Sequence, residues 1–479
     1  MKELNLGFTL CLSCLSVLSG NCKNSKDKCS EKEKMNVLFI MSDQHNANAL
    51  GCYGHDVVKT PNLDRLAANG VLFKSAYCQT GQSVPSRFSI FTGRYARSTG
   101  TYSNGNLQKA EENTVADLFS KEGYICATIG KHHMVMNETN NNHGFDVVEV
   151  PVGGHIPVNH LPKDEVYPGR SLVGESAEPN EKHSCGLIAK RTIDFIRDNK
   201  EKPFVVWCSF HGPHTPIVPS SPWSRMYSSS DVQLPPNHNI IDENMPGVEG
   251  LISKSGKFSS DIYHKKTTAL YWGLISQIDY NIGLVIDELK RLGLDKKTII
   301  VYTADHGEMM GEHKCWTKGT TAYEATIRVP CIISCPSLFS GGQVRDELVC
   351  SIDLLPTLLD CAGINIPSNI QGCSLLPLMK NQNVNWRDYI FTEIGSSVNN
   401  DCVGVRSHTA KYVRFKKNGK VIYEQLFDEE NDPWETVNQI NNPEYGNVLN
   451  NLKNVLHNWE NNVETSEPYL PKKKRISLK

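Results

Sequence analysis

The chain has 479 residues, of which 39% are hydrophobic, 21% charged and 8% aromatic. This composition excludes fibrous and intrinsically disordered proteins. The 50 Lys and Arg residues nearly balance the 52 Asp and Glu residues, which gives a formal charge of -2. A chain with this net charge has no overall positive electrostatic field to attract nucleic acid. We therefore expect no nucleic-acid partner, and we expect any anion to be bound by a local group of residues.

The first residues have the pattern of an export leader. A Lys at position 2 precedes the apolar run 10–18, and a polar stretch follows. That run is shorter than the ~20 residues that span a bilayer. We expect 1–22 to be the leader and 23–34 a tether, in a protein exported to the bacterial periplasm or attached to the outer membrane. Cys22 resembles the lipidated cysteine of bacterial lipoproteins, and a soluble exported protein is the alternative.

From residue 36 onward, short apolar runs alternate with segments of helical spacing. Runs this apolar are typical of strands in a parallel sheet that is covered on both faces. The alternation predicts an α/β fold with a large, mostly parallel sheet between helices. The predicted strands are 36–41, 126–130, 204–210, 298–302 and 331–334, and the predicted helices are 62–69, 115–122, 186–199 and 264–292.

The pattern changes near residue 385. Short alternating strands at 412–416 and 421–426 precede a helix around 448–459. These elements predict a smaller antiparallel α+β subdomain. We therefore expect a main catalytic domain over 35–385 and a C-terminal subdomain over 386–479.

Polar residues follow two of the predicted strands directly. The first strand runs into Asp43 and Gln44, and the strand at 298–302 runs on to Asp305 and His306. Functional groups gather at the carboxyl ends of strands in a parallel sheet. Three oxygen donors and one imidazole favour calcium, magnesium or manganese over zinc. A helix cap is the alternative for Asp43 alone.

A third cluster begins at Ser83. Pro85 suits the first turn of a helix, which would place Ser83 at the positive end of the helix dipole. Arg87 lies four residues after Ser83, so it returns to the same face, and Arg94 is the next cation that could do so. This spacing predicts a site for an anion around Ser83, with a capped helix near a surface Arg as the alternative.

The segment Ser83-x-Pro85-Ser86-Arg87, followed by Thr92-Gly93-Arg94, resembles the signature of the type I, formylglycine-dependent sulfatases. That family belongs to the alkaline phosphatase superfamily, so the resemblance implies an alkaline-phosphatase-like sheet. Further segments resemble the family's elements in the same order: 51–54, 60–64, 130–133, 213–216, 305–308, 311–318 and 426–435.

In that family, the first residue of the signature is converted to formylglycine, whose hydrated aldehyde is the nucleophile. One hydroxyl of the diol attacks sulfur, and the second then drives elimination of the sulfate. This chain has Ser at position 83 where many members have Cys. The resemblance therefore implies a Ser-type bacterial member that depends on a radical-type sulfatase-maturating enzyme as a partner.

The resemblance also implies roles for the site residues. The metal, calcium first and manganese as the alternative, would be held beside the converted Ser83 by four ligands. Arg87 would fix the diol, while Lys131 and Lys318 would bind sulfate oxygens. His214 would donate a proton to the leaving group, and His133 would serve the diol. The four ligands are Asp43, Gln44, Asp305 and His306, and the converted Ser83 belongs to the same metal site.

Three functions follow as hypotheses. The first is an exported sulfatase that acts on a sulfated carbohydrate such as a glycosaminoglycan fragment. The second is a phosphonate monoester or phosphodiester hydrolase on the same scaffold. The third is a non-catalytic glycan-binding protein in which Ser83 stays unmodified. We expect Tyr102, Asn104 and Trp316 to line the substrate pocket, because aromatic and amide side chains suit sugars.

Overall fold

The computed structural model describes residues 34–106, 108, 111–134, 142–150, 173–248, 260–319 and 321–466. Residues 35–479 belong to one compact unit and 1–34 to another, and only the first is described below. The predicted leader, Cys22 and most of the predicted tether lie outside the described residues. Within the described ranges, no helix combines the length and the apolar character that crossing a bilayer requires.

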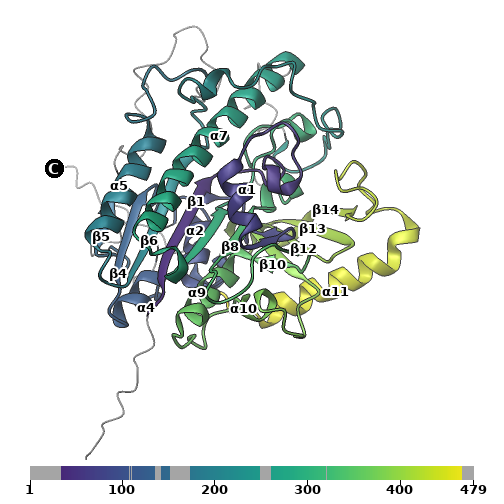
Figure 1. Cartoon of the computed structure of the whole chain (residues 1–479). Coiled ribbons are helices and arrows are strands. Elements are labelled where there is room, and N and C mark those ends of the chain that lie inside the picture. Colours follow the sequence, from purple (N-terminus) through teal and green to yellow (C-terminus); the bar gives the residue numbers. More distant parts are fainter. Residues whose placement is uncertain are drawn as a thin grey trace, which may run out of the picture. The chain divides into compact units, whose positions relative to one another are not determined.

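An eight-stranded sheet runs through the main part of the unit (Figure 1). Five neighbouring strands are parallel to one another, and β8 is antiparallel to both of its neighbours. The predicted α/β class with a large, mostly parallel sheet is confirmed. The strand order is β5 (Val147–Glu149), β4 (Ile125–Gly130), β6 (Phe204–Pro213), β1 (Asn36–Asp43), β7 (Thr298–Ala304), β8 (Cys331–Ser334), β2 (Val71–Phe73) and β9 (Gln343–Arg345).

The strands are apolar throughout because both faces of the sheet are covered. Along β1, Phe39 and Met41 belong to one hydrophobic core and Leu38 and Ile40 to the other, as the period of two in a strand requires. The first core includes side chains of α2 (Ser83–Thr92), α4 (Val115–Lys121), α9 (Leu354–Ala362) and α10 (Leu376–Met379). The second includes side chains of α1 (Pro61–Ala68), α5 (Ser184–Asp198) and α7 (Asp261–Arg291).

A second, antiparallel sheet forms the C-terminal part (Figure 1), as the alternating pattern predicts. The helix after it packs Leu452 and Leu456 against Val403 and Val405 of that sheet. The strands are β11 (Ile390–Ser397), β12 (Asn400–Arg406), β13 (Ala410–Lys417) and β14 (Lys420–Asp428), and the helix is α11 (Gly446–Asn462). The shorter elements are β3 (Ala76–Tyr77), β10 (Val349–Cys350), α3 (Ala96–Thr99) and α8 (Glu324–Ile327).

Buried charges join α8 to the C-terminal sheet. The Lys411 Nζ atom lies 3.1 Å from Glu324 Oε1, 3.3 Å from Glu429 Oε1 and 2.5 Å from Glu435 Oε1. Arg406 adds a second cation, whose Nε donates to Glu324 Oε1 at 3.3 Å. We call these five residues the junction cluster. Because each of its cations contacts more than one chain segment, the cluster fixes the C-terminal sheet against the main sheet's loops.

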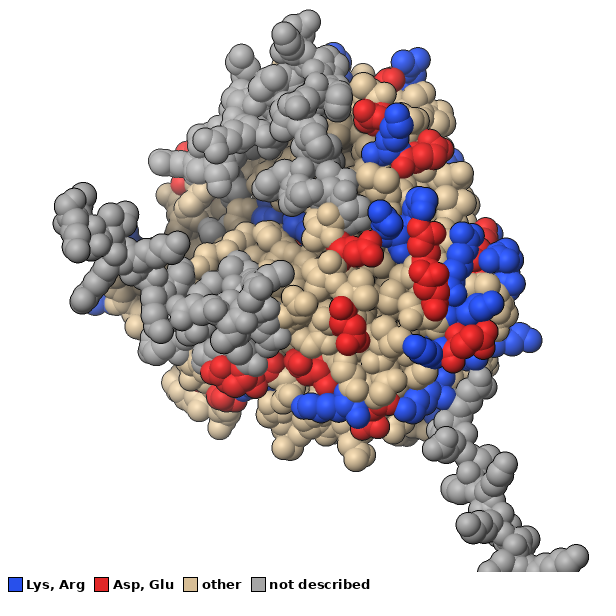
Figure 2. Space-filling model, turned by 90° about the vertical axis from the view of Figure 1, so that its left-hand side faces the viewer, with Lys and Arg blue, Asp and Glu red and all other residues tan. Residues whose placement is uncertain are grey.

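Acidic and basic side chains are interspersed on the described part of the face that Figure 2 shows. Neither sign covers a broad area of that part of the surface. On the described part of this face, charge is therefore mixed and not gathered into a patch of one sign.

Candidate functional site

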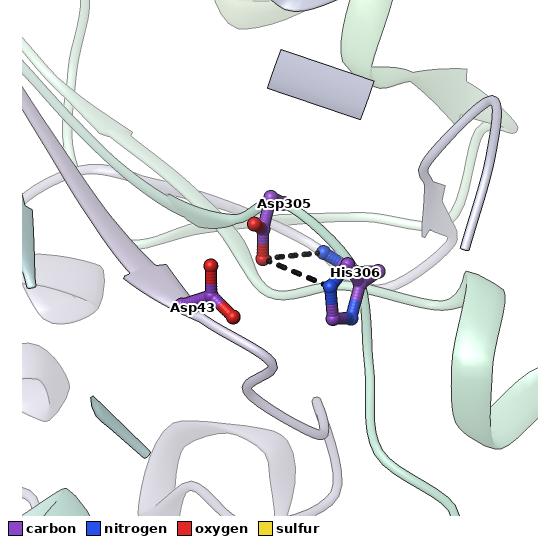
Figure 3. A group of neighbouring side chains, drawn as sticks. All are labelled: Asp43, Asp305 and His306. Atoms are coloured by element: carbon purple, nitrogen blue, oxygen red, sulfur yellow. Dashed lines mark hydrogen bonds and ion pairs between the residues drawn. The ribbon is translucent and has the colours of Figure 1, made fainter. Parts of the chain in front are cut away.

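The carboxyl ends of two adjacent strands bring the predicted metal ligands together. In the parallel register of β1 and β7, Ser42 is paired with Ala304, so the residues that follow each strand are neighbours. Figure 3 shows Asp43 at the end of its strand and Asp305 and His306 in the loop opposite it. One ligand atom from each of these three residues lies within 4.8 Å of the others.

The donor atoms fit a hard divalent cation. Asp43 is fully buried, and its Oδ1 has no hydrogen-bond partner among the described residues. The His306 ring faces the Gly307 carbonyl oxygen with Nδ1 at 2.9 Å, so Nδ1 carries the proton and Nε2 keeps its lone pair. Gln44 adds an amide oxygen, and its backbone N–H donates to Asp305 Oδ1 at 3.0 Å. An oxygen-rich set with one imidazole suits calcium, magnesium or manganese.

The two carboxylates are electrostatically unequal. Burial raises the pKa of Asp43, but Lys131, His214 and Arg87 outweigh burial and hold that pKa well below its usual value. Burial and the charge of Asp43 raise the pKa of Asp305 to about 6. A divalent cation between the two side chains would relieve this repulsion, which is a further reason why the group suits a metal.

Ser83 begins helix α2 beside the same group. Its Oγ lies 3.0 Å from His306 Nε2 and accepts a hydrogen bond from Lys318 Nζ at 3.2 Å. The start of the helix is held by Asn104, whose Oδ1 accepts from the Val84 N–H at 3.0 Å. The hydroxyl of Ser86 donates to the Asp305 carbonyl oxygen at 2.5 Å. The helix is therefore anchored directly to the metal-ligand loop.

Arg87 crosses the centre of the site and is fully buried. Its Nε donates to Asp305 Oδ2 at 2.8 Å, and its Nη2 donates to Asp43 Oδ2 at 2.9 Å. Its Nη1 donates to the Ser209 hydroxyl at 2.8 Å and to the Lys131 carbonyl oxygen at 2.7 Å. The guanidinium thus fixes both carboxylates in place and leaves Oδ1 of Asp43 open to a metal.

Three further predicted residues surround Asp43 and Ser83. The Lys131 Nζ atom lies 2.6 Å from Asp43 Oδ2, and the His214 Nε2 atom lies 4.0 Å from Asp43 Oδ1. Lys318 Nζ donates to Gln44 Oε1 at 3.1 Å and lies 2.9 Å from His306 Nε2. Lys318 therefore contacts Ser83 directly, whereas Lys131 and His214 lie beside Asp43.

His133 lies farther out than the other predicted site residues. It follows β4 two residues after Lys131, and its side chain is exposed. It interacts electrostatically with Lys131 and Arg87. The structure therefore keeps His133 at the rim of the site and does not place it among the buried ligands.

The basic and imidazole groups are shifted toward their neutral forms. Burial, with Lys318 next, lowers the pKa of both His214 and His306 well below its usual value. Burial also lowers the pKa of Lys318. The Nδ1 of His214 lies 2.7 Å from the Thr215 carbonyl oxygen, so the neutral ring keeps its proton there and Nε2 accepts. A bound anion would offset the charge of Lys318 and raise these pKa values.

Three sequence-based expectations about the surroundings of the site are wrong. Arg94 does not return to the face of Ser83, because its guanidinium pairs with Glu112 at 2.6 Å and with Glu464. Tyr102 and Trp316 are each only 4% exposed, so they do not line an open pocket. The indole N–H of Trp316 donates to His264 Nδ1 at 2.8 Å, and the hydroxyl of Tyr102 donates to the Ser466 carbonyl oxygen at 3.0 Å.

Three residues have contacts with the site that the sequence did not assign to them. Ser209 lies inside an apolar strand and accepts from Arg87. Asn104, expected in the substrate pocket, holds the start of α2. Glu308 contacts Gln44 and the backbone before Lys318. A single polar residue inside an apolar strand was the available signal for Ser209, whereas the contact of Asn104 with Val84 depends on tertiary structure.

Comparison with known proteins gives consistent matches over most of the chain. The family model described as Sulfatase matches residues 35–364, and the model described as N-sulphoglucosamine sulphohydrolase, C-terminal, matches residues 311–462. The chain is 33% identical to an arylsulfatase of Clostridium perfringens over 88% of this chain and 94% of that protein. It is 25% identical to an N-acetylglucosamine-6-O-sulfatase of Bacteroides thetaiotaomicron over 96% of this chain and 92% of that protein.

A solved structure adds a third comparison. The phosphonate monoester hydrolase of Silicibacter pomeroyi superposes with a TM-score of 0.79 at 25% identity, and covers 91% of this chain and 100% of its own. Since the matches extend over both sheets, they apply to the C-terminal part as well as to the site.

Proposed function

Because this chain belongs to the sulfatase family and is a sulfuric ester hydrolase, we propose that it hydrolyses sulfate monoesters of carbohydrates through a formylglycine formed from Ser83. One observation carries this proposal. The Ser83 Oγ lies at the start of α2, 3.0 Å from His306 Nε2 and 3.2 Å from Lys318 Nζ, beside the buried carboxylates. A nucleophile at this point would meet both a set of metal-ligating oxygens and a cation.

The proposed substrate class is a sulfated sugar such as a glycosaminoglycan fragment. A relative over 96% of the chain is an N-acetylglucosamine-6-O-sulfatase, and the C-terminal family model is named for an N-sulphoglucosamine sulphohydrolase. Both names support glucosamine sulfates as the first substrates to test. The interspersed surface charge favours recognition of the anion inside the site over attraction to a broad basic surface.

The conversion of Ser83 would remove two hydrogen atoms from its CH2–OH group, and a radical-type maturating enzyme would accept them. The resulting hydrated aldehyde supplies two hydroxyls, one to attack sulfur and one to expel the sulfate. A divalent cation, calcium first and manganese as the alternative, would polarise a sulfate oxygen and lower the pKa of the attacking hydroxyl. Its ligands would be Asp43, Gln44, Asp305 and His306, with residue 83 beside them.

The side chains of the chain itself would then position the reacting groups. Arg87 keeps both carboxylates oriented, and it would fix the diol. Lys131 and Lys318 would bind sulfate oxygens and neutralise the charge that grows as the ester bond breaks. His214, whose pKa rises once an anion offsets Lys318, would give a proton to the leaving alcohol. His133, at the rim, would take a proton from the diol.

The first experiment is the mass of the tryptic peptide 75–87, from protein made with and without a Ser-type maturase. Conversion of Ser83 lowers the mass by about two units, since two hydrogens are lost. Converted protein should release sulfate from 6-O-sulfated or N-sulfated glucosamine, and unconverted protein should not. Converted protein that releases sulfate from no sugar or aryl ester would contradict the proposal, and Ser83→Ala serves as the inactive control.

A second activity is favoured by one specific observation. A phosphonate monoester hydrolase has the same fold at 25% identity with a TM-score of 0.79. We include a phosphonate monoester and a phosphate diester in the substrate panel for this reason. A kcat/KM for these compounds above that for every sulfate ester would move the assignment to phosphonate hydrolysis.

We also propose export, on the evidence of the leader-like residues 1–22. The protein would then act in the bacterial periplasm or at the outer membrane, with a lipid anchor on Cys22. Fractionation of cells that produce the full chain and a Cys22→Ser variant tests this. Loss of membrane association in the variant supports lipidation, and a chain that stays in the cytoplasm in both cases contradicts export.

A further inference from the structure

A buried carboxylate outside the proposed ligand set touches two parts of the site at once. Glu308 is 1% exposed, and its Oε2 accepts a hydrogen bond from the side-chain amide of Gln44. Its Oε1 accepts from the backbone N–H of Thr317, and from that of Met310 at 3.2 Å. Thr317 immediately precedes Lys318 in the chain. Glu308 therefore links a proposed metal ligand to the loop that carries a site cation.

We propose that Glu308 is a positioning residue, which orients the amide of Gln44 so that its oxygen faces the metal and Lys318. This inference rests on the metal-ligand role proposed above for Gln44. It assigns Glu308 no contact with substrate or with the reacting atoms.

The two ends of the Gln44 amide differ in what they can bind. An amide has an acceptor oxygen and a donor nitrogen of nearly equal size, so its orientation is set by its partners. Oε2 of Glu308 accepts from Nε2 at one end, and the Lys318 ammonium at the other end has only donors. Oε1 of Gln44 therefore points the other way, where it accepts from Lys318 Nζ at 3.1 Å. A metal ion also requires the oxygen at that end.

Backbone conformation gives independent support. Gln44 and Thr317 have φ of 63° and 70°, in the left-handed region that residues with a Cβ rarely adopt. Such conformations persist where the surrounding contacts determine them. Glu308 contacts the side chain of one and the N–H of the other. Glu308 therefore contacts the two residues whose positive φ angles need support from their surroundings.

The substitution Glu308→Gln tests the orientation directly. The amide oxygen introduced at position 308 can still accept from the two backbone N–H groups, but the new amide nitrogen would then face the Nε2 of Gln44. Two donors cannot pair, so Gln44 turns its nitrogen toward the metal. We expect calorimetric titration with Ca²⁺, and separately with Mn²⁺, to show a dissociation constant about 10–100-fold higher than in the unsubstituted chain.

Both titrations use the full chain with Ser83 unconverted. They are run at pH 8 for every variant. The same buffer serves every variant, so differences in affinity report the substitution alone.

A matched control lies on the same loop. Glu312 is 6% exposed and accepts a hydrogen bond from Asn237 Nδ2 at 2.9 Å. Asn237 is not a proposed metal ligand. The substitution Glu312→Gln removes a similarly buried carboxylate and should change the dissociation constant less than about threefold. Equal weakening by both substitutions would overturn the proposal, because a general loss of charge in the loop would then explain it.

The double variant Gln44→Glu with Glu308→Gln reverses the pair. The amide nitrogen at position 308 can then donate to the carboxylate at position 44, while the amide oxygen keeps both backbone N–H groups. We expect this variant to bind Ca²⁺ at least as tightly as the unsubstituted chain. Binding as weak as in Glu308→Gln alone would overturn the proposal, and so would unchanged binding in the single variant. If Glu308→Gln does not fold, the double variant still decides, because the proposal requires it to fold and bind.

These titrations do not depend on sulfatase turnover. If Ser83 is not converted, or if no sulfated sugar is hydrolysed, the proposed function fails while the metal-affinity comparison remains valid. If the metal affinities contradict the role of Glu308, the sulfatase proposal is unaffected. In converted protein we expect Glu308→Gln to lower kcat more than it raises KM, since the site residues move while the rim stays in place.

Discussion

The charged side chains at the ends of β1 and β7 and those of the junction cluster are similarly buried, but they are neutralised differently. In the junction cluster, Lys411 contacts carboxylates of Glu324, Glu429 and Glu435, so its charge is shared among protein groups. At the site, Asp43 Oδ1 has no hydrogen-bond partner in the described part of the chain. In the junction cluster, buried charge thus joins two parts of the fold. At the site, the buried Asp43 carboxylate keeps one oxygen available to a ligand.

The comparison separates stability from activity. Breaking the buried ion pairs of the junction cluster should destabilise the fold and leave the chemistry intact. Removing a group from the site should stop the chemistry and change stability little. The predictions below test this separation, beginning with the largest expected effect.

The largest effect is expected for Ser83→Ala. Loss of the hydroxyl that becomes the nucleophile should lower kcat/KM for sulfate esters by about a thousandfold or more. The urea midpoint should change little, because the hydroxyl contributes contacts with His306 and Lys318 and buries little apolar surface. Steady-state sulfate release and urea unfolding check both parts. Unfolding of the variant at much lower urea would show that the site also maintains the fold.

The opposite result is expected for Lys411→Met. Lys411 is fully buried, and Met keeps most of its length but leaves three carboxylates with Arg406 as the remaining cation of the junction cluster. Breaking such a buried group by removing one partner costs about 3–5 kcal/mol. Urea unfolding measures this loss, and kcat/KM of the remaining folded enzyme should stay within about twofold. Lys416→Met is the control, since Lys416 is 20% exposed and pairs with Glu460 at 3.4 Å.

Metal removal should have an intermediate effect on stability. An ion present at 100 times its dissociation constant stabilises the folded chain by about 2.7 kcal/mol. Chelation should therefore lower the unfolding temperature and abolish sulfate release, and added Ca²⁺ should restore both. The shift should be the same in Lys411→Met as in the unsubstituted chain. A different shift in that variant would show that the two charged regions are coupled.

A pH dependence of stability is also expected from the junction cluster. Burial raises the pKa of Glu435 to about 7 and that of Glu429 to about 8. A raised folded-state pKa means that the folded chain binds more protons than the unfolded chain between about pH 4.5 and these values. Stability from these groups is therefore present below about pH 4.5 and is lost as the pH rises toward 8, by up to about 1.4 kcal/mol per pH unit for each group.

Urea unfolding at pH 5, 6.5 and 8 measures this slope. Glu429→Gln should reduce the slope, because a neutral amide does not titrate in this range. An unchanged slope in that variant would mean that Glu429 stays ionised on Lys411 throughout. Ser83→Ala should keep the slope of the unsubstituted chain.

Much of the fold could be predicted because strands and helices that are buried have recognisable patterns of apolar residues. All five predicted strands are strands of the main sheet, and the four predicted helices lie within about two residues of α1, α4, α5 and α7, apart from the start of α7. Very short strands such as β2 and β9 carry too few residues to show a pattern. The antiparallel direction of β8 also left no signal, because a run that is buried on both faces reads the same in either direction.

The sequence by itself determined which groups meet at the site. Asp43 and Asp305 follow strands whose parallel pairing must bring their carboxyl ends together, and helical spacing must return Arg87 to the face of Ser83. Tertiary structure alone decided the direction of each side chain. It turned Arg94 toward Glu112, buried Trp316 against His264, and placed Glu308 behind Gln44. Those contacts join residues far apart in the chain, and their geometry depends on packing that local pattern does not encode.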